Sequence, residues 1–203
     1  MDKIDFTNKL SNEFYFSPVK EVARRLLGKI LVRIYNKELL AGRIVEAEAY
    51  GGPSDEASHA YPGKTKRNEV MFKKGGLLYV YFTYGMHFCC NAVTGPEGKG
   101  EAVLIRGIEP IAGIGLMALN RFGRMDITSK EKINLTSGPA KITQAFGISR
   151  HDNGTDLTGD EIFILNSPEI ASKKISVSKR IGIKKSVDLP WRFYINGNSF
   201  VSK

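Results

Sequence analysis

The segment from Gly42 to Tyr50 places two glutamates and a tyrosine at alternate positions. Side chains alternate between the two faces of a β-strand, so Glu46, Glu48 and Tyr50 share one face and small or aliphatic residues occupy the other. A carboxylate can act as a general base by taking a proton from water, provided that its surroundings tune its pKa. The spacing alone does not choose between Glu46 and Glu48, and a solvated strand face is the alternative interpretation.

Aromatic rings and an imidazole follow these carboxylates along the chain. His59 comes nine residues after Tyr50, and five aromatic residues fall between Tyr79 and Phe88. β-forming residues on both sides of a turn near residues 83–86 predict a hairpin. Tyr84 would lie at its tip, where a large ring is hard to bury. Such a ring can wedge between stacked bases, unless the tip folds back on its own domain.

The bulk composition favours a polyanionic partner. The chain has 203 residues, a hydrophobic content of 42%, a charged content of 25% and a net charge of +9. The length suits one domain with a real core, here residues 1–203. The charge indicates nucleic acid first and an anionic membrane second. Carboxylate, imidazole and flat rings in such a protein suggest hydrolytic chemistry on a flat, anionic substrate.

The same composition argues against several other classes of protein. The only cysteines, Cys89 and Cys90, are adjacent, so we expect no disulfide framework and a reducing, cytoplasmic compartment. No apolar run approaches the roughly 20 residues that a membrane span needs, and the first residues contain no apolar signal core. With two cysteines and three histidines spread over the chain, no zinc-ligand spacing appears.

Two groups of basic residues are candidate contacts to a phosphate backbone. Six cations and no acid fall within thirteen residues. These are Lys173, Lys174, Lys179, Arg180, Lys184 and Lys185. A charge run is usually a solvated face, but against a net charge of +9 a phosphate-facing surface is at least as reasonable. Ser137 and Lys141, at a predicted helix start, suit a phosphate as well, with an ordinary N-cap as the alternative.

Two polar residues stand in otherwise apolar predicted strands. Arg106 is the lone cation in the run from Ala102 to Ile108. A cation in such a strand needs a carboxylate partner, and Glu48 is a candidate. Asn91 either reads a base edge or satisfies backbone groups.

The elements that must position these residues mix helices with hairpins, without a repeated βαβ unit. In the first half of the chain we predict a helix between Ser17-Pro18 and Gly28, strands over 29–35 and 42–50, a short helix over 67–73 and the hairpin over 77–93. A strand over 101–108 follows, then a helix that opens at Glu109-Pro110 and a flexible excursion over 122–134. A helix from Ser137 to near Gly147 and short strands near 161–165, 174–183 and 192–201 complete the chain. This order predicts an α+β domain with a curved, mostly antiparallel sheet, flanking helices and a protruding β-hairpin.

Several blocks of the chain, taken in order, resemble one known family: the alkyladenine (3-methyladenine) DNA glycosylases of the mammalian-type fold, which also occur in bacteria. The matching blocks are Gly42–Tyr50, Asp55–His59, Arg67–Phe72, Leu78–Met86, Ala102–Arg106, Ser137–Lys141 and Arg192–Tyr194. The match runs in order from about residue 15 to the C-terminus, and several blocks in one order are far more specific than any single motif.

The resemblance implies a monofunctional glycosylase that flips a damaged purine out of duplex DNA and hydrolyses its N-glycosidic bond, without metal or cofactor. Glu48 would be the water-activating base, and Arg106 would help to hold the water. The base pocket would be lined by Tyr50, His59, Tyr81, Asn91 and Ile183. Asn91 would exclude the exocyclic amine of guanine, and Tyr84 would fill the gap left in the helix. The expected partner is duplex DNA with damaged purines, bound by a monomer.

Two other hypotheses remain at this point. A nucleic-acid-binding module without chemistry would use Glu46 and Glu48 only to pair with Arg43 or Arg106, and would bind duplex DNA without releasing a base. A hydrolase of free nucleosides would leave the charge of +9 and the predicted tip residue Tyr84 unexplained.

Overall fold

The strand that carries the two glutamates lies at the centre of the sheet. In this computed structural model, which describes residues 5–83 and 86–202, β2 (Glu38–Tyr50) pairs along one edge with β5 (Glu101–Ala112). Along its other edge it pairs first with β1 (Ile30–Tyr35) and then with β8 (Arg192–Ile195). The half of β2 that contains the glutamates is therefore enclosed by β5 and β8.

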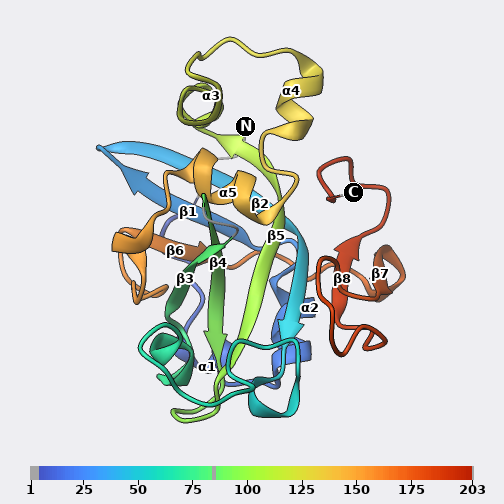
Figure 1. Cartoon of the computed structure of the whole chain (residues 1–203). Coiled ribbons are helices and arrows are strands. Elements are labelled where there is room, and N and C mark those ends of the chain that lie inside the picture. The colour runs from blue at the N-terminus through green and yellow to red at the C-terminus, as the bar shows by residue number, and fades with distance from the viewer. Residues whose placement is uncertain (1–4, 84–85, 203) are drawn as a thin grey trace.

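The remaining strands extend the sheet on both sides. Its order is β3 (Leu78–Thr83), β4 (His87–Thr94), β5, β2, β1 and β6 (Ile162–Leu165), while β7 (Ile175–Ser178) pairs with β8. All strand pairs in the described residues are antiparallel. The long strands β2 and β5 bend as they cross the molecule (Figure 1). The predicted α+β fold with a mostly antiparallel sheet is confirmed.

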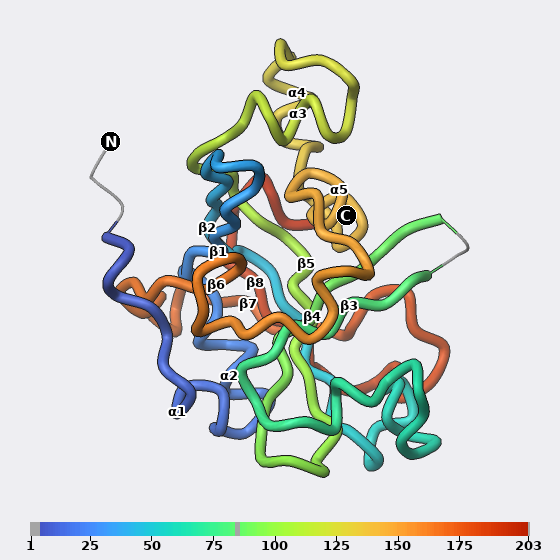
Figure 2. The backbone as a smooth tube through the Cα atoms, turned by 90° about the vertical axis from the view of Figure 1, so that its left-hand side faces the viewer, coloured from blue at the N-terminus to red at the C-terminus, as the bar shows by residue number. Residues whose placement is uncertain are grey.

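The predicted aromatic hairpin is formed by β3 and β4, which pair from Leu78 opposite Ala92 to Thr83 opposite His87. Figure 2 shows the described ends of these two strands projecting from the body of the molecule. Tyr84 and Gly85, between them, lie outside the described residues.

Short helices pack around the sheet. The α-helices are α1 (Asn12–Tyr15), α2 (Val19–Leu26), α3 (Ile114–Phe122), α4 (Ser129–Asn134) and α5 (Pro139–Phe146), and 3₁₀ turns span Gly52–Ser54, Glu69–Phe72, Arg150–Asp152 and Ser172–Lys174. The predicted helix after Ser17 is therefore present, with Pro18 at the N-cap rather than at the first helical position. No helix within 5–83 or 86–202 is both long enough and apolar enough to cross a membrane.

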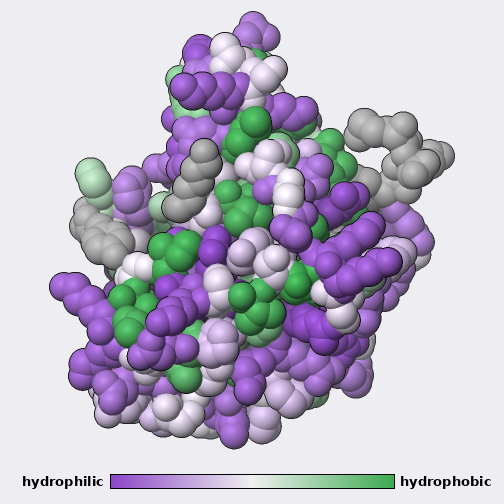
Figure 3. Space-filling view, turned by 90° about the vertical axis from the view of Figure 1, so that its right-hand side faces the viewer, coloured by the Kyte–Doolittle hydropathy of each residue, from purple (hydrophilic) through white to green (hydrophobic). Residues whose placement is uncertain are grey.

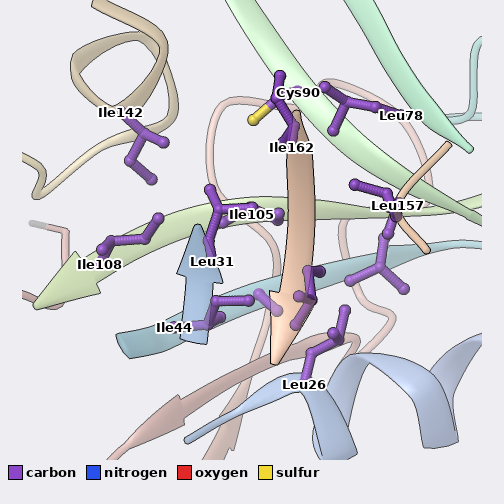
Figure 4. Packing of buried hydrophobic residues seen from close by; sticks show 14 of the residues in the cluster. Leu26, Leu31, Ile44, Leu78, Cys90, Ile105, Ile108, Ile142, Leu157 and Ile162 are labelled. Carbon is purple, nitrogen blue, oxygen red and sulfur yellow. The ribbon is translucent and has the colours of Figure 1, made fainter. Parts of the chain in front are cut away.

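The hydrophobic core packs α2 and α5 against β2 and its neighbour β5. Leu26 of α2, Ile44 of β2, Ile105 of β5 and Ile142 of α5 are all fully buried and belong to one cluster. Figure 4 shows these side chains converging from their separate elements. Full burial of a side chain of this size contributes about 1.5–3 kcal/mol, so the strand that carries the glutamates is held firmly in place.

The predicted helix start at Glu109-Pro110 is wrong. β5 continues to Ala112, and Pro110 pairs opposite Gly42 next to a register shift. Proline is tolerated in a strand at such an irregularity, because a ladder hydrogen bond is already missing there. The strand ends only at Gly113, which has φ 73° and precedes the first turn of α3.

The predicted flexible excursion over residues 122–134 contains a helix instead. α4 begins with a capping box: the Thr128 hydroxyl accepts from the Glu131 N–H, and the Glu131 carboxylate accepts from the Thr128 N–H. This reciprocal pair satisfies two backbone donors that a helix start leaves free. Together α3 and α4 form the lobe at the top of Figure 1.

Candidate active site

The carboxylate of Glu46 is fully buried and saturated with donors. Arg192 Nε donates to Oε1 at 2.6 Å, and Ser202 donates its N–H to Oε2 at 2.6 Å and its hydroxyl to Oε1 at 2.9 Å. Arg106 Nε lies 3.1 Å from Oε1. A Cβ on Gly107 would come within 2.9 Å of Glu46 Cβ, so glycine permits this close packing. Glu46 is the centre of a structural network.

The carboxylate of Glu48 is equally buried but has fewer partners. The Tyr50 hydroxyl donates to Oε2 at 3.0 Å, the Ile181 N–H donates to Oε1 at 2.9 Å, and Arg106 Nε lies 3.6 Å from Oε1. Burial raises the pKa of Glu48 above its ordinary value, while Arg106 and the two hydrogen bonds act in the opposite direction. The interpretation of this face as solvated is wrong for both glutamates.

A cavity of about 460 Å³ lies next to Glu48, since Tyr50, Arg106 and Ile181 all contact its carboxylate and all line the cavity. Its volume falls within the range of roughly 300–1,000 Å³ typical of small-molecule sites. The predicted catalytic and base-pocket residues that line it are Tyr50, His59, Tyr81, Asn91, Arg106 and Ile183. The fold therefore brings these six residues together from separate parts of the chain.

One wall of the cavity is aromatic and uncharged. The His59 ring meets Tyr81 edge-on at 4.4 Å, and the rings of Tyr79 and Tyr81 stack at 5.5 Å. His59 Nδ1 lies 3.1 Å from the Tyr79 hydroxyl. Burial lowers the pKa of His59, and the positive charge of Arg67 lowers it further. The imidazole is therefore neutral near pH 7. The wall offers flat faces without a positive charge of its own.

Asn91 lies in β4 opposite Tyr79 and is buried. Its Nδ2 donates to the Tyr79 carbonyl at 3.1 Å, and its side chain also lines the cavity. The amide thus satisfies a backbone acceptor, as one of the two sequence interpretations expected. Because Asn91 also lies in the cavity wall, its contact with a bound base remains a prediction.

Arg180 does not belong to a phosphate-facing surface, which corrects the sequence prediction. It is buried, and its guanidinium contacts both carboxylate oxygens of Asp55. Counting charges along the chain cannot distinguish it from its neighbours, because Asp55 is 125 residues away.

The lysines of the same run are exposed, but only some of them lie at the cavity. Lys173, Lys174, Lys179, Lys184 and Lys185 are all exposed. Lys184 and Lys185 line the cavity, whereas Lys173 and Lys174 lie in the 3₁₀ turn before β7. The face over β7 and β8 is mainly hydrophilic, with smaller apolar areas between (Figure 3). Phosphate contact by these lysines remains a prediction.

Ser137 and Lys141 lie at the start of α5, which opens with Pro139 as predicted. Lys141 Nζ bonds to the side chain of Asn134 and lies 3.5 Å from Ser137 Oγ. Burial lowers the pKa of Lys141, and Arg121 adds to the effect. Because Pro139 lines the cavity, this pair lies close to the cavity, and its contact with DNA remains a prediction.

Tyr84 is the one predicted site residue outside the described part of the chain. Cys89 and Cys90 are free and buried, and Cys89 lines the cavity. Within residues 5–83 and 86–202, no three His, Cys, Asp or Glu side chains form a group that could hold a metal ion.

Sequence reasoning missed four contributors to the site: Asp55, Ile181, Arg192 and Ser202. Each acts through a contact that spans more than 120 residues of sequence. Ile181 acts through its backbone N–H, for which a side-chain pattern carries no signal. A buried carboxylate needs partners, and this requirement predicts that such residues exist without saying which they are.

Comparison with known proteins identifies a family and relatives over nearly the whole chain. The family model for methylpurine-DNA glycosylase (MPG) matches residues 13–199. A protein of Carboxydothermus hydrogenoformans is 51% identical over 195 residues, which cover 96% of this chain and 98% of the relative. A protein of Chlorobium luteolum is 47% identical over 196 residues, which cover 96% and 97%.

A third relative, from Francisella tularensis, is 51% identical over 187 residues, which cover 90% of this chain and 93% of the relative. Each of the three is named "Putative 3-methyladenine DNA glycosylase". The chain belongs to the methylpurine-DNA glycosylase family. The resemblance recognised in the sequence is confirmed.

Proposed function

We propose that this protein is a monofunctional DNA glycosylase that removes alkylated or deaminated purines from duplex DNA. The flipped base would enter the cavity, and a water activated by Glu48 would hydrolyse the N-glycosidic bond. The protein would act as a monomer, near the nucleoid of the cytoplasm. Family membership and the names of the relatives support the class of reaction.

The observation that carries the proposal is the contact between a buried carboxylate and residues that line a partly aromatic cavity. Glu48 touches three lining residues, Tyr50, Arg106 and Ile181. Burial raises its pKa, which makes the ionised carboxylate a better proton acceptor than an exposed one. A non-catalytic module would not need a carboxylate with this environment at the wall of a cavity.

The chemistry assigned to these residues is simple. A water held between Arg106 and Glu48 would attack C1′ of the nucleotide while Glu48 accepts its proton. The N-glycosidic bond would break with its electron pair going to the base. Because Glu48 is fully buried without substrate, a local shift of the wall must admit this water, and catalytic contacts often tighten only in the complex.

The aromatic wall suits the leaving group. In DNA, a purine alkylated at N3 or N7 is cationic, and aromatic faces attract cations. A lowered pKa keeps His59 neutral, so the wall does not repel such a base. Extruding a base costs a few kcal/mol, least for a damaged one. An aromatic side chain such as Tyr84 would recover part of this cost by filling the vacated stack.

The test is an assay for released base. The protein is incubated with duplex DNA that contains either alkylated purines or inosine, and free base and alkali-labile sites are measured. The proposal expects both products from damaged duplex and neither from undamaged duplex. Tight binding of damaged duplex without any released base would favour the non-catalytic module instead.

A further inference from the structure

The segment between β7 and β8 forms one side of the proposed site. Its residue Ile181 donates its backbone N–H to Glu48, and Ile183, Lys184 and Lys185 line the cavity. This stretch contains no helix or strand of its own. Besides the backbone bond from the Ala49 N–H to the Trp191 carbonyl at 2.9 Å, its position beside Glu48 depends on side-chain contacts.

Arg180 supplies the main contacts of this kind. Its Nη2 donates to Asp55 Oδ1 at 2.8 Å, and its Nη1 donates to Asp55 Oδ2 and, at 2.9 Å, to the Ala49 carbonyl. The guanidinium carbon lies 4.7 Å from the Tyr50 ring centre and 5.2 Å from that of Trp191. A two-point bond between a guanidinium and a carboxylate fixes both orientation and distance.

Asp55 connects Arg180 to the residues that follow the end of β2. It also accepts from the N–H groups of Gly51 and Ala57, both at 3.1 Å. Burial alone would raise its pKa, but the hydrogen bonds from Arg180 and Gly51 outweigh burial and hold the pKa of Asp55 below its ordinary value. Asp55 thus stays ionised near pH 7, and the pair remains charged on both sides.

We propose that Arg180 and Asp55 are positioning residues that hold the Ile181 N–H against the catalytic carboxylate. The contacts act on adjacent residues, because Ala49 lies next to Glu48 and Arg180 lies next to Ile181. This inference rests on the proposed role of Glu48 as the base. It assigns to Arg180 a role inside the protein that is independent of DNA phosphates.

The expected consequence follows from the groups that face Glu48. They are Glu46 and Tyr50 from β2, Arg106 from β5, Arg192 from β8, which holds Glu46, and the Ile181 N–H. The Ile181 N–H favours the ionised carboxylate and so lowers the pKa of Glu48. Without it, Glu48 would bind a proton at higher pH and would lose its function as a base there.

The test uses Arg180→Lys and Asp55→Asn, with single-turnover release of hypoxanthine from an inosine-containing duplex measured across the pH range. Lysine keeps the charge of Arg180 but cannot form the two-point bond. We expect the acidic limb of the rate profile to move upward by about one pH unit in both variants. The rate loss should therefore be greatest at acidic pH and smallest at alkaline pH.

Arg33→Lys is the matched control. Arg33 and Asp152 form a similar two-point pair, with distances of 3.1 and 3.0 Å and side chains only 11% and 13% exposed. Neither residue lines the cavity. This variant should lower Tm without moving the acidic limb, which separates positioning from a general loss of stability.

Three outcomes decide the matter when Glu48→Gln is assayed in parallel. If Glu48→Gln is inactive and both site variants shift the acidic limb, the positioning role is supported. If Glu48→Gln is inactive but the limb stays in place, or Arg33→Lys shifts it equally, the positioning role is overturned alone. If Glu48→Gln keeps the normal rate, the proposed function and this inference both fall.

Discussion

Glu46 and Glu48 lie two residues apart on one face of β2 and are both fully buried, yet their surroundings differ. Glu46 accepts from Arg192 and twice from Ser202, and these donors occupy both of its oxygens. Within residues 5–83 and 86–202, Glu48 accepts hydrogen bonds only from Tyr50 and Ile181, and both of these residues line the cavity. The difference shows that environment, and not residue type or spacing, separates a structural carboxylate from a candidate catalyst.

Arg106 connects the two environments. Its Nε lies 3.1 Å from Glu46 and 3.6 Å from Glu48, and it donates to the Ser202 hydroxyl at 3.0 Å. The Glu46 network therefore holds the guanidinium that partly offsets the effect of burial on the pKa of Glu48. The structural carboxylate therefore supports the candidate base, Glu48, through a shared arginine.

The largest effect is expected for Glu48→Gln. The amide keeps the size of the side chain but cannot accept the proton, and general-base catalysis typically contributes about 10²–10⁴-fold. Base release from damaged duplex should fall by that factor, while binding of the same duplex should be unchanged. Single-turnover assays and equilibrium binding would measure the two quantities. A fully active Glu48→Gln, together with an inactive Glu46→Gln, would reverse the assignment of the two carboxylates.

Glu46→Gln should show the opposite balance between stability and rate. Removing its charge leaves Arg192 buried without a counter-ion, and breaking one partner of a buried pair costs up to about 3–5 kcal/mol. We expect Tm to fall by several degrees, with a rate loss well below that of Glu48→Gln. Thermal unfolding of both variants would check this. A Glu46→Gln protein as stable as the wild type would contradict the structural role.

The sequence predicted those parts of the site that depend on local patterns. Strand alternation placed Glu46, Glu48 and Tyr50 on one face, and the aromatic run predicted the hairpin that carries Tyr81 and Asn91. The resemblance to a family added the roles of Glu48 and Arg106. The strand and hairpin predictions are confirmed because β-periodicity and turn residues act over a few neighbouring positions, whereas the roles of Glu48 and Arg106 remain predictions.

The parts that could not be predicted depend on distant contacts. Arg180 has the same local context as exposed lysines, and only the folded chain brings Asp55 to it across 125 residues. Ser202 reaches Glu46 across 156 residues. The false helix start at Pro110 arose because the continued pairing of β5 with β2 outweighed the local preference of proline.

The pH dependence would sharpen the contrast between the two carboxylates. Burial raises the pKa of Glu48 above the ordinary value of 4.5, and the base must be ionised to act. Base release from inosine-containing duplex should therefore fall on acidification at a pH above that value, about tenfold for each unit below the pKa. A rate that stays constant down to the ordinary range of a glutamate would show that Glu48 is not the titrating base.

Smaller effects are expected from the exposed lysines, and the structure divides them into two pairs. Lys184 and Lys185 line the cavity, whereas Lys173 and Lys174 do not. Reversal of either pair to glutamate should weaken binding to damaged and undamaged duplex alike, because phosphate contacts carry no sequence information. The slope of log Kd against log salt concentration should flatten by about 1 for each lysine that no longer neutralises a phosphate.

We expect the larger change for Lys184 and Lys185, with the other pair as the matched control. Binding titrations at several salt concentrations would measure both slopes. An unchanged slope for both pairs would place the DNA on another surface. A larger change for Lys173 and Lys174 would indicate that the duplex crosses the turn before β7 instead of the cavity mouth.

No effect at all is expected from removal of divalent ions. Two neighbouring carboxylates can bind a metal ion when their oxygens are free, but those of Glu46 already accept from Arg192 and Ser202. The nearby guanidinium of Arg106 would also repel a cation brought between Glu46 and Glu48. Base release in excess EDTA should equal that in its absence. Loss of activity in EDTA, restored by an added divalent ion, would mean that donors other than these two carboxylates hold an essential metal. In that case, hydrolysis by Glu48 alone would no longer explain the reaction.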